Sequence, residues 1–224
     1  MPRRLSRASA PGTTAPSLPA TLESLPSSLR DPTLPLPKLI IFDLDYTLWP
    51  FWVDCHVSPP LKPTTTANNN PQNAATDRLG ESFAFYPDVA PILHALPHLG
   101  TAHRPRLAVA SRTSAPSLAR DLLKLLHLPV GVEGRQRRAL DAFDGGTEIY
   151  PGSKVRHMEA LQRRTGVAYE DMLFFDDETR NRDTETLGVT MHLVSEGVSW
   201  GTVADGIQEW RRRRGHGDGQ QQQQ

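Results

Sequence analysis

The chain has 224 residues, with 25 basic and 25 acidic side chains and a formal net charge of zero. Its length suits one domain with tails, and the charge balance predicts no general affinity for nucleic acid. The single cysteine, Cys55, excludes an internal disulfide, and because neither a long apolar segment nor a secretory signal is visible, we expect a cytoplasmic protein without membrane contact.

Residues 1–36 are rich in Pro, Ser, Ala and Thr, and we predict a disordered N-terminal tail there. A segment of this composition buries too little apolar surface to become ordered. Its arginines, among them Arg3, Arg4 and Arg7, and its few acids are also typical of a mitochondrial transit peptide. The many prolines oppose the amphipathic helix of such a peptide, which favours the tail.

The first predicted strand, over residues 39–43, is a continuous apolar run that ends in Asp43 and Asp45. Such a run is typical of a strand covered on both faces. Carboxylates at its carboxyl end lie where open α/β sheets bind their ligands. The alternative is that these two acids only cap a helix or form a turn.

The stretch that follows, residues 61–82, is polar and low in complexity. It separates the first strand from a helix predicted near 88–98, and we predict a polar cap or loop insertion that could overhang the site.

The second predicted strand, 106–110, runs through Ser111 and Arg112 into a helix over 115–127. Hydroxyls and backbone N–H groups at a helix start can bind an anion, and a guanidinium can hold phosphate with two hydrogen bonds. The alternative is an ordinary helix cap, for example by Thr113.

Residues 131–146 are predicted to form a surface loop, followed by a helix over 153–165 that ends at Gly166. Lys154 lies in the first turn of that helix, where a cation opposes the helix dipole. This position indicates a charge directed at phosphate, although a solvated surface lysine is the alternative.

The third predicted strand, 171–175, ends in Asp176, Asp177 and Glu178. Three adjacent carboxylates repel one another unless a cation binds them, and Mg²⁺ prefers oxygen ligands of this kind. Glu178 also fits the first turn of a following helix, which is the alternative for that residue.

Predicted strands and helices alternate along the chain. The strands are at 39–43, 106–110, 171–175 and 189–194, and the helices are near 88–98, 115–127, 153–165, 178–187 and 200–211. This order predicts a three-layer, Rossmann-like α/β fold over residues 37–210, with a parallel sheet between helical layers. All the polar signals follow strands, so they should converge at one sheet edge. Residues 211–224, rich in Arg, Gly and Gln, are predicted to be a disordered C-terminal tail.

Taken together, the motifs resemble the magnesium-dependent phosphatase-1 family of the haloacid dehalogenase (HAD) superfamily. The residues that carry the resemblance are Asp-x-Asp-x-Thr at 43–47, Trp49-Pro50-Phe51-Trp52, Ser111-Arg112, Tyr150-Pro151-Gly152-Ser153-Lys154 and Phe174-Phe175-Asp176-Asp177-Glu178. The resemblance covers residues 37–210 and implies the HAD fold with a minimal cap and an open site.

The resemblance implies that Asp43 is the nucleophile, which forms an aspartyl-phosphate that water then cleaves. It implies that Asp45 is the general acid and base, so the pKa of Asp45 should be raised relative to that of Asp43. Mg²⁺ is expected on the carboxylates of Asp43 and Asp176 and on the backbone carbonyl of Asp45, with Asp177 bound directly or through water.

For the phosphate group, the resemblance implies binding by Leu44, Ser111 and Lys154 at the phosphoryl oxygens and by Arg112 on the substrate side. Thr47 is expected to support the loop rather than react.

Family members act on phosphotyrosine-containing protein and on sugar phosphates, including phosphorylated glycation products, so these are the implied substrates. The aromatic group Tyr46, Trp49, Phe51 and Trp52 either stacks on a phenyl ring or sugar, or packs beneath the loop. We expect a monomer.

Three other functions compete with a phosphatase. A non-catalytic phosphate-binding or phospho-acceptor module does not need Asp45 or the Ser111-Arg112 pair. A haloacid dehalogenase needs neither an acid at position 45 nor a magnesium cluster. A HAD phosphomutase needs a large cap that shields the phosphoenzyme from water, and no such cap is visible.

Overall fold

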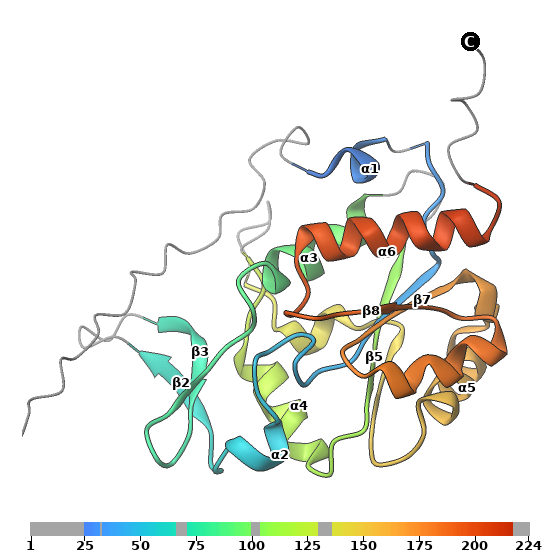
Figure 1. The fold of residues 1–224 in the computed structure, drawn as a ribbon. Helices are drawn as coiled ribbons and strands as arrows, with labels where there is room; N and C mark the ends of the chain where they lie inside the picture. Colours follow the sequence, from blue (N-terminus) through green and yellow to red (C-terminus); the bar gives the residue numbers. More distant parts are fainter. Residues whose placement is uncertain (1–24, 32, 66–70, 100–103, 130–135, 217–224) are drawn as a thin grey trace, which may run out of the picture.

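The computed structural model describes residues 25–31, 33–65, 71–99, 104–129 and 136–216. Its centre is a sheet of five parallel strands in the order β6-β5-β1-β7-β8 (Figure 1). The strands are β1 (Leu39–Phe42), β5 (Arg106–Ser111), β6 (Gly146–Ile149), β7 (Met172–Asp176) and β8 (Thr190–Leu193). The predicted parallel sheet is confirmed. Strand β6 was not predicted, because its sequence Gly-Thr-Glu-Ile has no apolar run.

Strand β1 shows why its sequence is continuously apolar. All four of its side chains are fully buried. Ile40 and Phe42 lie in one hydrophobic core, and Leu39 and Ile41 lie in another on the opposite face of the sheet. Both faces are therefore covered, as expected for a central strand of a parallel sheet.

Helices cover both faces of this sheet and complete a three-layer fold. One face is covered by α3 (Val89–Ala95), the 3₁₀ turn η2 (Leu96–His98), α4 (Pro116–Leu125) and α6 (Trp200–Arg213). The other face is covered by α5 (Lys154–Thr165) and the 3₁₀ helix η5 (Thr179–Leu187). Figure 1 shows α6 and α5 on opposite sides of strands β7 and β8. Two further 3₁₀ turns are η3 (Ala139–Ala142) and η4 (Tyr169–Asp171).

Helix α5 begins and ends where the sequence predicts. The Ser153 hydroxyl accepts a hydrogen bond from the backbone N–H of Arg156 at 3.3 Å, which caps the helix start. Gly166 has a φ of 69°, in the left-handed region where glycine ends helices at low cost. Lys154 is the first helical residue, so its position in the helix is fixed by the cap.

The prediction of a disordered N-terminal tail is wrong for residues 25–31 and 33–36. This segment contains α1 (Ser27–Arg30) and packs over α6 (Figure 1), with Leu25, Leu29 and Leu36 buried. The Arg211 guanidinium donates to the carbonyls of Ser28 at 2.7 Å and Pro35 at 2.8 Å. The tail was predicted from its average composition, which does not show that these three leucines can be buried together. Residues 1–24, where a transit peptide was the alternative, lie outside the described residues.

The predicted C-terminal tail is also wrong at its start, because α6 continues to Arg213. Arg212 and Arg213 pair with Glu209, and Arg213 Nη1 also lies 2.8 Å from a Glu185 oxygen. Partners three and four positions away on a helix make an arginine run compatible with order. Residues 217–224 lie outside the described part of the chain.

The 61–82 insertion forms an antiparallel sheet that lies to one side of the main sheet (Figure 1). Its strands are β2 (Lys62–Thr65), β3 (Pro71–Thr76) and β4 (Ser82–Phe83). Asn73 exchanges two hydrogen bonds of 2.7 Å with the backbone of His127, next to the end of α4. The insertion is thus tied to the core of the fold. Of the 131–146 loop, residues 136–146 are described, and they include η3.

No helix in the described ranges has the length and apolar character that crossing a membrane requires.

Candidate active site

The strand ends bring together residues that are far apart in sequence. Phe42, the last residue of β1, pairs with Val109 of β5 and with Phe175 of β7. Asp43 therefore emerges beside Asp176, and its backbone N–H donates to the Phe175 carbonyl at 2.9 Å. The expected convergence at the carboxyl edge of the sheet is what the structure shows.

Lys154 lies in the interior between two of these carboxylates. Its ammonium nitrogen is 2.7 Å from Asp43 Oδ1 and 2.9 Å from Asp176 Oδ2, and it also donates to the Ala110 carbonyl. The side chain is only 1 % exposed and lies over the Phe174 ring at 5.1 Å from its centroid. Burial alone would lower the pKa of Lys154, but the two carboxylates raise it. A solvated surface lysine is therefore excluded.

Three acids form a cluster suited to a hard cation. Carboxylate oxygens of Asp43, Asp176 and Asp177 all lie within 4.8 Å of one another. Burial, and then the charge of Asp176, raise the pKa of Asp177 to about 6. One ammonium, that of Lys154, cannot balance three carboxylates, so the cluster favours one more positive charge. Oxygen ligands at this spacing fit Mg²⁺.

The pKa of both acids of the first strand end is raised, but their neighbours differ. Burial, followed by the charge of Asp176, holds the pKa of Asp43 above its ordinary value although Lys154 lowers it. Burial raises the pKa of Asp45 to about 7. The pKa of Asp45 is raised, as expected, but the pKa of Asp43 is raised as well.

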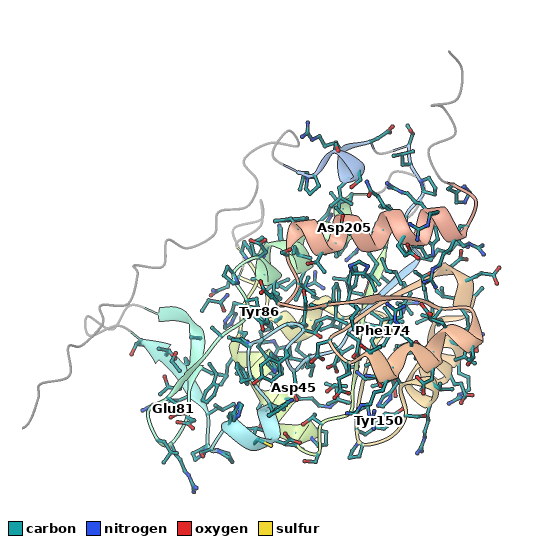
Figure 2. All side chains as sticks on the ribbon, in the orientation of Figure 1. Asp45, Glu81, Tyr86, Tyr150, Phe174 and Asp205 are labelled. Atoms are coloured by element: carbon teal, nitrogen blue, oxygen red, sulfur yellow. The ribbon has the colours of Figure 1, made fainter. Side chains whose placement is uncertain are left out.

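Asp45 lies beside α2 (Val53–His56) (Figure 2), and neutral hydrogen-bond donors hold its carboxyl. Its Oδ1 accepts from the indole N–H of Trp49 at 2.7 Å and from the backbone N–H of Val53 at 3.2 Å. The next residue, Tyr46, has a φ of 53°, which turns the chain sharply after the acid. The capping alternative is thus partly right for Asp45, because it binds the first N–H of α2.

The buried side-chain amide of Asn181 holds Asp176 at the end of β7. The sequence did not single out this residue. Asn181 of η5 is 2 % exposed, and its amide nitrogen donates to both oxygens of Asp176, at 2.8 and 2.9 Å. Its amide oxygen accepts from the Arg112 guanidinium at 3.3 Å. Asn181 lies five positions after Asp176 in a polar helix, and nothing in the sequence pattern there indicates this role.

The turn after β5 contains the predicted phosphate-binding residues. The Ser111 hydroxyl accepts from the backbone N–H of Thr113 at 3.4 Å, and the Thr113 hydroxyl accepts from that of Ala115 at 3.2 Å. Asp54 of α2 accepts from the Ser114 hydroxyl at 2.7 Å and so joins this turn to the Asp45 side. Thr113 shapes the turn and does not cap α4, whose cap residue is Ala115.

A cleft of about 400 Å³ that is open to solvent lies at these strand ends. Its lining includes the predicted residues Asp43, Asp45, Ser111, Arg112, Lys154 and Asp177. The Leu44 side chain is fully buried, so Leu44 can take part only through its backbone N–H, which contacts the Asp43 carboxyl. None of the described residues of the insertion sheet lines the cleft, and whether the insertion overhangs the site stays a prediction.

A larger hollow, of about 540 Å³, lies between β8 and α6. Its walls carry paired charges such as Glu209 and Arg213. Within the described ranges, the acidic cluster suited to a metal lies at the strand ends and not there. We therefore take the smaller cleft, at the strand ends, as the candidate active site.

The aromatic group after Asp45 divides into two parts. Trp49 and Phe51 are buried and stack on each other, with ring centroids 5.4 Å apart. Trp52 is 51 % exposed and lines the cleft, and Tyr46 meets it edge-on at 5.2 Å. Packing beneath the loop is therefore correct for Trp49 and Phe51, whereas Trp52 is available to a substrate.

Comparison with known proteins agrees with this geometry. The family model for acid phosphatases matches residues 35–213. Magnesium-dependent phosphatase 1 of Homo sapiens is 40% identical over 178 residues, which cover 79% of this chain and 89% of that protein. The chain belongs to the magnesium-dependent phosphatase-1 family. It is accordingly a phosphoric monoester hydrolase with magnesium as its cofactor, and the resemblance drawn from the motifs is confirmed.

Two yeast proteins extend this family relationship. A HAD-like hydrolase superfamily protein of Schizosaccharomyces pombe is 41% identical and covers 69% of this chain and 83% of its own length. A putative magnesium-dependent phosphatase of Saccharomyces cerevisiae is 31% identical and covers 75% of this chain and 94% of its own length. The region that the acid phosphatase family model matches, residues 35–213, includes every strand-end motif.

Proposed function

We propose that this phosphatase hydrolyses phosphomonoesters in two half-reactions, through an aspartyl-phosphate on Asp43. The observation that carries the proposal is the arrangement at the sheet edge. A buried carboxylate paired with Lys154 lies at the base of an open cleft, and a second carboxyl, Asp45, lines the same cleft. The first group suits a nucleophile and the second suits a proton donor and acceptor.

In the first half-reaction, an Asp43 oxygen attacks the phosphorus. The bond between Asp43 and phosphorus forms, the bond to the leaving oxygen breaks, and the Asp45 proton passes to that oxygen. Raised to about 7, the pKa of Asp45 keeps a substantial protonated fraction near neutral pH.

In the second half-reaction, Asp45 is a carboxylate and takes a proton from water. The water oxygen bonds to phosphorus, the bond between Asp43 and phosphorus breaks, and inorganic phosphate leaves. Asp43 returns as a carboxylate and Asp45 returns protonated, so the cycle closes.

The metal ligands in this proposal are Asp43, Asp176 and the backbone carbonyl of Asp45, with Asp177 direct or through water. Magnesium bound there supplies positive charge that keeps the carboxylates ionised and offsets their repulsion of an anionic substrate. Asn181 fixes both oxygens of Asp176, which orients that ligand.

Ser111, Arg112, Lys154 and the Leu44 backbone N–H are the proposed phosphate ligands. Lys154 already directs its ammonium at Asp43, Asp176 and the Ala110 carbonyl. A phosphoryl oxygen must therefore share or replace one of these contacts. Arg112 lines the cleft with one contact to Asn181, which leaves further N–H groups for phosphate.

The competing functions fit this geometry less well. A phospho-acceptor or phosphate-binding module has no use for a second carboxyl held in the cleft by two donors. A dehalogenase does not need the three-acid cluster. A phosphomutase must exclude water, yet the cleft is open among the described residues.

For the substrate, we favour an aryl phosphomonoester such as phosphotyrosine over a sugar phosphate such as a phosphorylated glycation product. Trp52 supports this choice, because its half-exposed indole lines the cleft and offers a flat apolar face. The monomeric state and the cytoplasmic location stay predictions.

Hydrolysis of p-nitrophenyl phosphate by the purified chain tests the proposed function, with Mg²⁺, with EDTA, and beside Asp43→Asn. Magnesium-dependent turnover that disappears in the folded variant supports the covalent mechanism. Retained hydrolysis in Asp43→Asn would remove Asp43 from the chemistry. Parallel assays with a phosphotyrosine peptide and a sugar phosphate then compare the two substrate classes.

A further inference from the structure

We propose that Trp49 is a positioning residue that orients Asp45 for proton transfer to the leaving group. This inference rests on the proposed function, because it concerns the acid of the same reaction. It starts from one contact, the 2.7 Å hydrogen bond from the indole N–H of Trp49 to Asp45 Oδ1.

The hydrogen bonds of Asp45 distinguish its two oxygens. Among the described residues, both donors, Trp49 Nε1 and the backbone N–H of Val53, contact Oδ1. An oxygen that accepts two N–H groups is a poor place for the proton, since the proton would meet the donors. The acidic proton therefore lies on Oδ2. The Trp49 contact, the shorter of the two, thus helps to determine which oxygen of Asp45 delivers the proton.

Trp49 is well suited to hold another side chain because its own ring cannot easily move. It is fully buried and stacks on Phe51 with an interplanar angle of 2° and on Phe85 with an angle of 18°. An isolated β-bridge also joins the backbones of Asp45 and Trp49. Rotation of the indole would disturb both stacks, so the direction of its N–H is fixed.

The same aromatic stack connects the acid to the insertion sheet. Phe51 meets Phe83 of β4 edge-on, with ring centroids 4.9 Å apart. Phe85, two residues further, stacks on Trp49 at 6.0 Å. Through Phe83, the insertion sheet packs against the Phe51 ring, which in turn stacks on Trp49.

The consequence of losing the indole N–H depends on the leaving group. An alkoxide needs a proton as it leaves, whereas p-nitrophenolate is stable without one. A misaligned Asp45 therefore slows hydrolysis of an alkyl phosphate more than hydrolysis of p-nitrophenyl phosphate. A merely structural role of Trp49 would lower both rates together.

The test is Trp49→Phe, assayed with p-nitrophenyl phosphate and with glycerol 2-phosphate as kcat/KM, which reports the steps up to departure of the leaving group. General acid catalysis contributes roughly 10²- to 10⁴-fold, and loss of part of it should lower kcat/KM for the alkyl substrate about tenfold. We expect less than about a twofold change for the aryl substrate.

Phe51→Leu is the matched control, because it removes a stacking partner of Trp49 but keeps the indole N–H. We expect its ratio of alkyl to aryl kcat/KM to stay near that of the unaltered chain. Equal losses for both substrates in Trp49→Phe would overturn the positioning role. Activity in Asp43→Asn would instead overturn the proposed function, so the two failures are distinguishable.

A measurement on the ¹⁵N-labelled chain covers the case in which Trp49→Phe does not fold. The chain has four tryptophans, whose indole N–H signals can be compared between the unaltered chain and Asp45→Ala. We expect one indole proton to lose a strong hydrogen bond and move upfield in Asp45→Ala. If none of the four moves, the Trp49 contact does not exist in solution and the inference fails.

Discussion

The cleft has two sides that hold their carboxyl groups by opposite means. On the charged side, formed by Asp43, Lys154, Asp176 and Asn181, a buried ammonium lies within 2.9 Å of two carboxylates. On the neutral side, formed by Asp45, Trp49 and Val53, two uncharged N–H groups hold the carboxyl. A cation strongly favours the ionised form of a neighbouring acid. An uncharged indole N–H orients an acid and disfavours its protonated form less than a cation does. This difference supports the proposed roles, with the nucleophile on the charged side and the acid on the neutral side.

The largest effect is expected from removing the charge of the charged side by Lys154→Met. Asp43 and Asp176 would then remain buried without their ammonium, which costs about 3–5 kcal/mol of unfolding free energy. Chemical denaturation in EDTA measures this loss. It should be smaller at low pH, where the carboxyls take up protons. A loss that does not change with pH would mean that packing of the lysine chain, and not its charge, stabilises the site.

Asn181→Ala should have the next largest effect, because it removes both amide contacts to Asp176. Loss of such a partner typically weakens metal binding about 10- to 100-fold. The Mg²⁺ concentration that gives half-maximal activity, and the Mg²⁺ dependence of the melting temperature, measure this change. Asn73→Ala is the matched control, since that amide bonds to His127 away from the cleft. If both variants need the same Mg²⁺ concentration as the unaltered chain, Asn181 does not orient a metal ligand.

A smaller effect concerns pH and magnesium together. The raised pKa values of Asp177, about 6, and Asp45, about 7, mean that the metal-free fold favours protonated carboxyls. Their stabilisation is fully present below their ordinary pKa of 3.8 and is lost as the pH rises through about 6 to 7. Of these two carboxyls, that of Asp177 is a proposed magnesium ligand and must be ionised to bind, so magnesium should raise the melting temperature more at about pH 8 than at about pH 5.5. An equal rise at both pH values would contradict these raised pKa values.

The smallest effect is expected at the mouth of the neutral side, from Trp52→Ala. An aromatic contact of about 0.5–1.5 kcal/mol corresponds to a rise in KM of roughly 2- to 10-fold for a phosphotyrosine peptide. Hydrolysis of acetyl phosphate, which has no ring, should keep its KM. Trp52→Phe retains a ring, and we expect its KM for the phosphotyrosine peptide to lie between that of the unaltered chain and that of Trp52→Ala. An equal rise in KM for both substrates would argue against stacking.

The sequence predicts the acids and the lysine of the cleft better than the side chains that hold those acids, for a physical reason. Asp43, Asp176 and Lys154 each stand next to the end of a strand or the start of a helix, so topology alone brings them together. Trp49 and Asn181 act through side chains whose direction depends on tertiary packing. No periodicity in the sequence encodes that direction.

The same limit applies to the ends of the fold. Leu25, Leu29 and Arg211 look like parts of tails by composition, yet they become ordered because each finds its partner in the other segment. Strand β6 was missed because it carries the pattern of an edge strand, with Thr147 and Glu148 only partly buried. Pairing between distant segments is information that local composition does not contain.

The central claim is that Asp43 carries the phosphoryl group during turnover. The most direct test is to mix Asp45→Asn with p-nitrophenyl phosphate and Mg²⁺, quench with acid, and map the phosphoryl group by peptide mass spectrometry. Slow hydrolysis of the intermediate in this variant should make it accumulate. We predict the added mass of one phosphoryl group on Asp43, and none in the Asp43→Asn, Asp45→Asn double variant. A phosphoryl group mapped to any other residue would contradict the account.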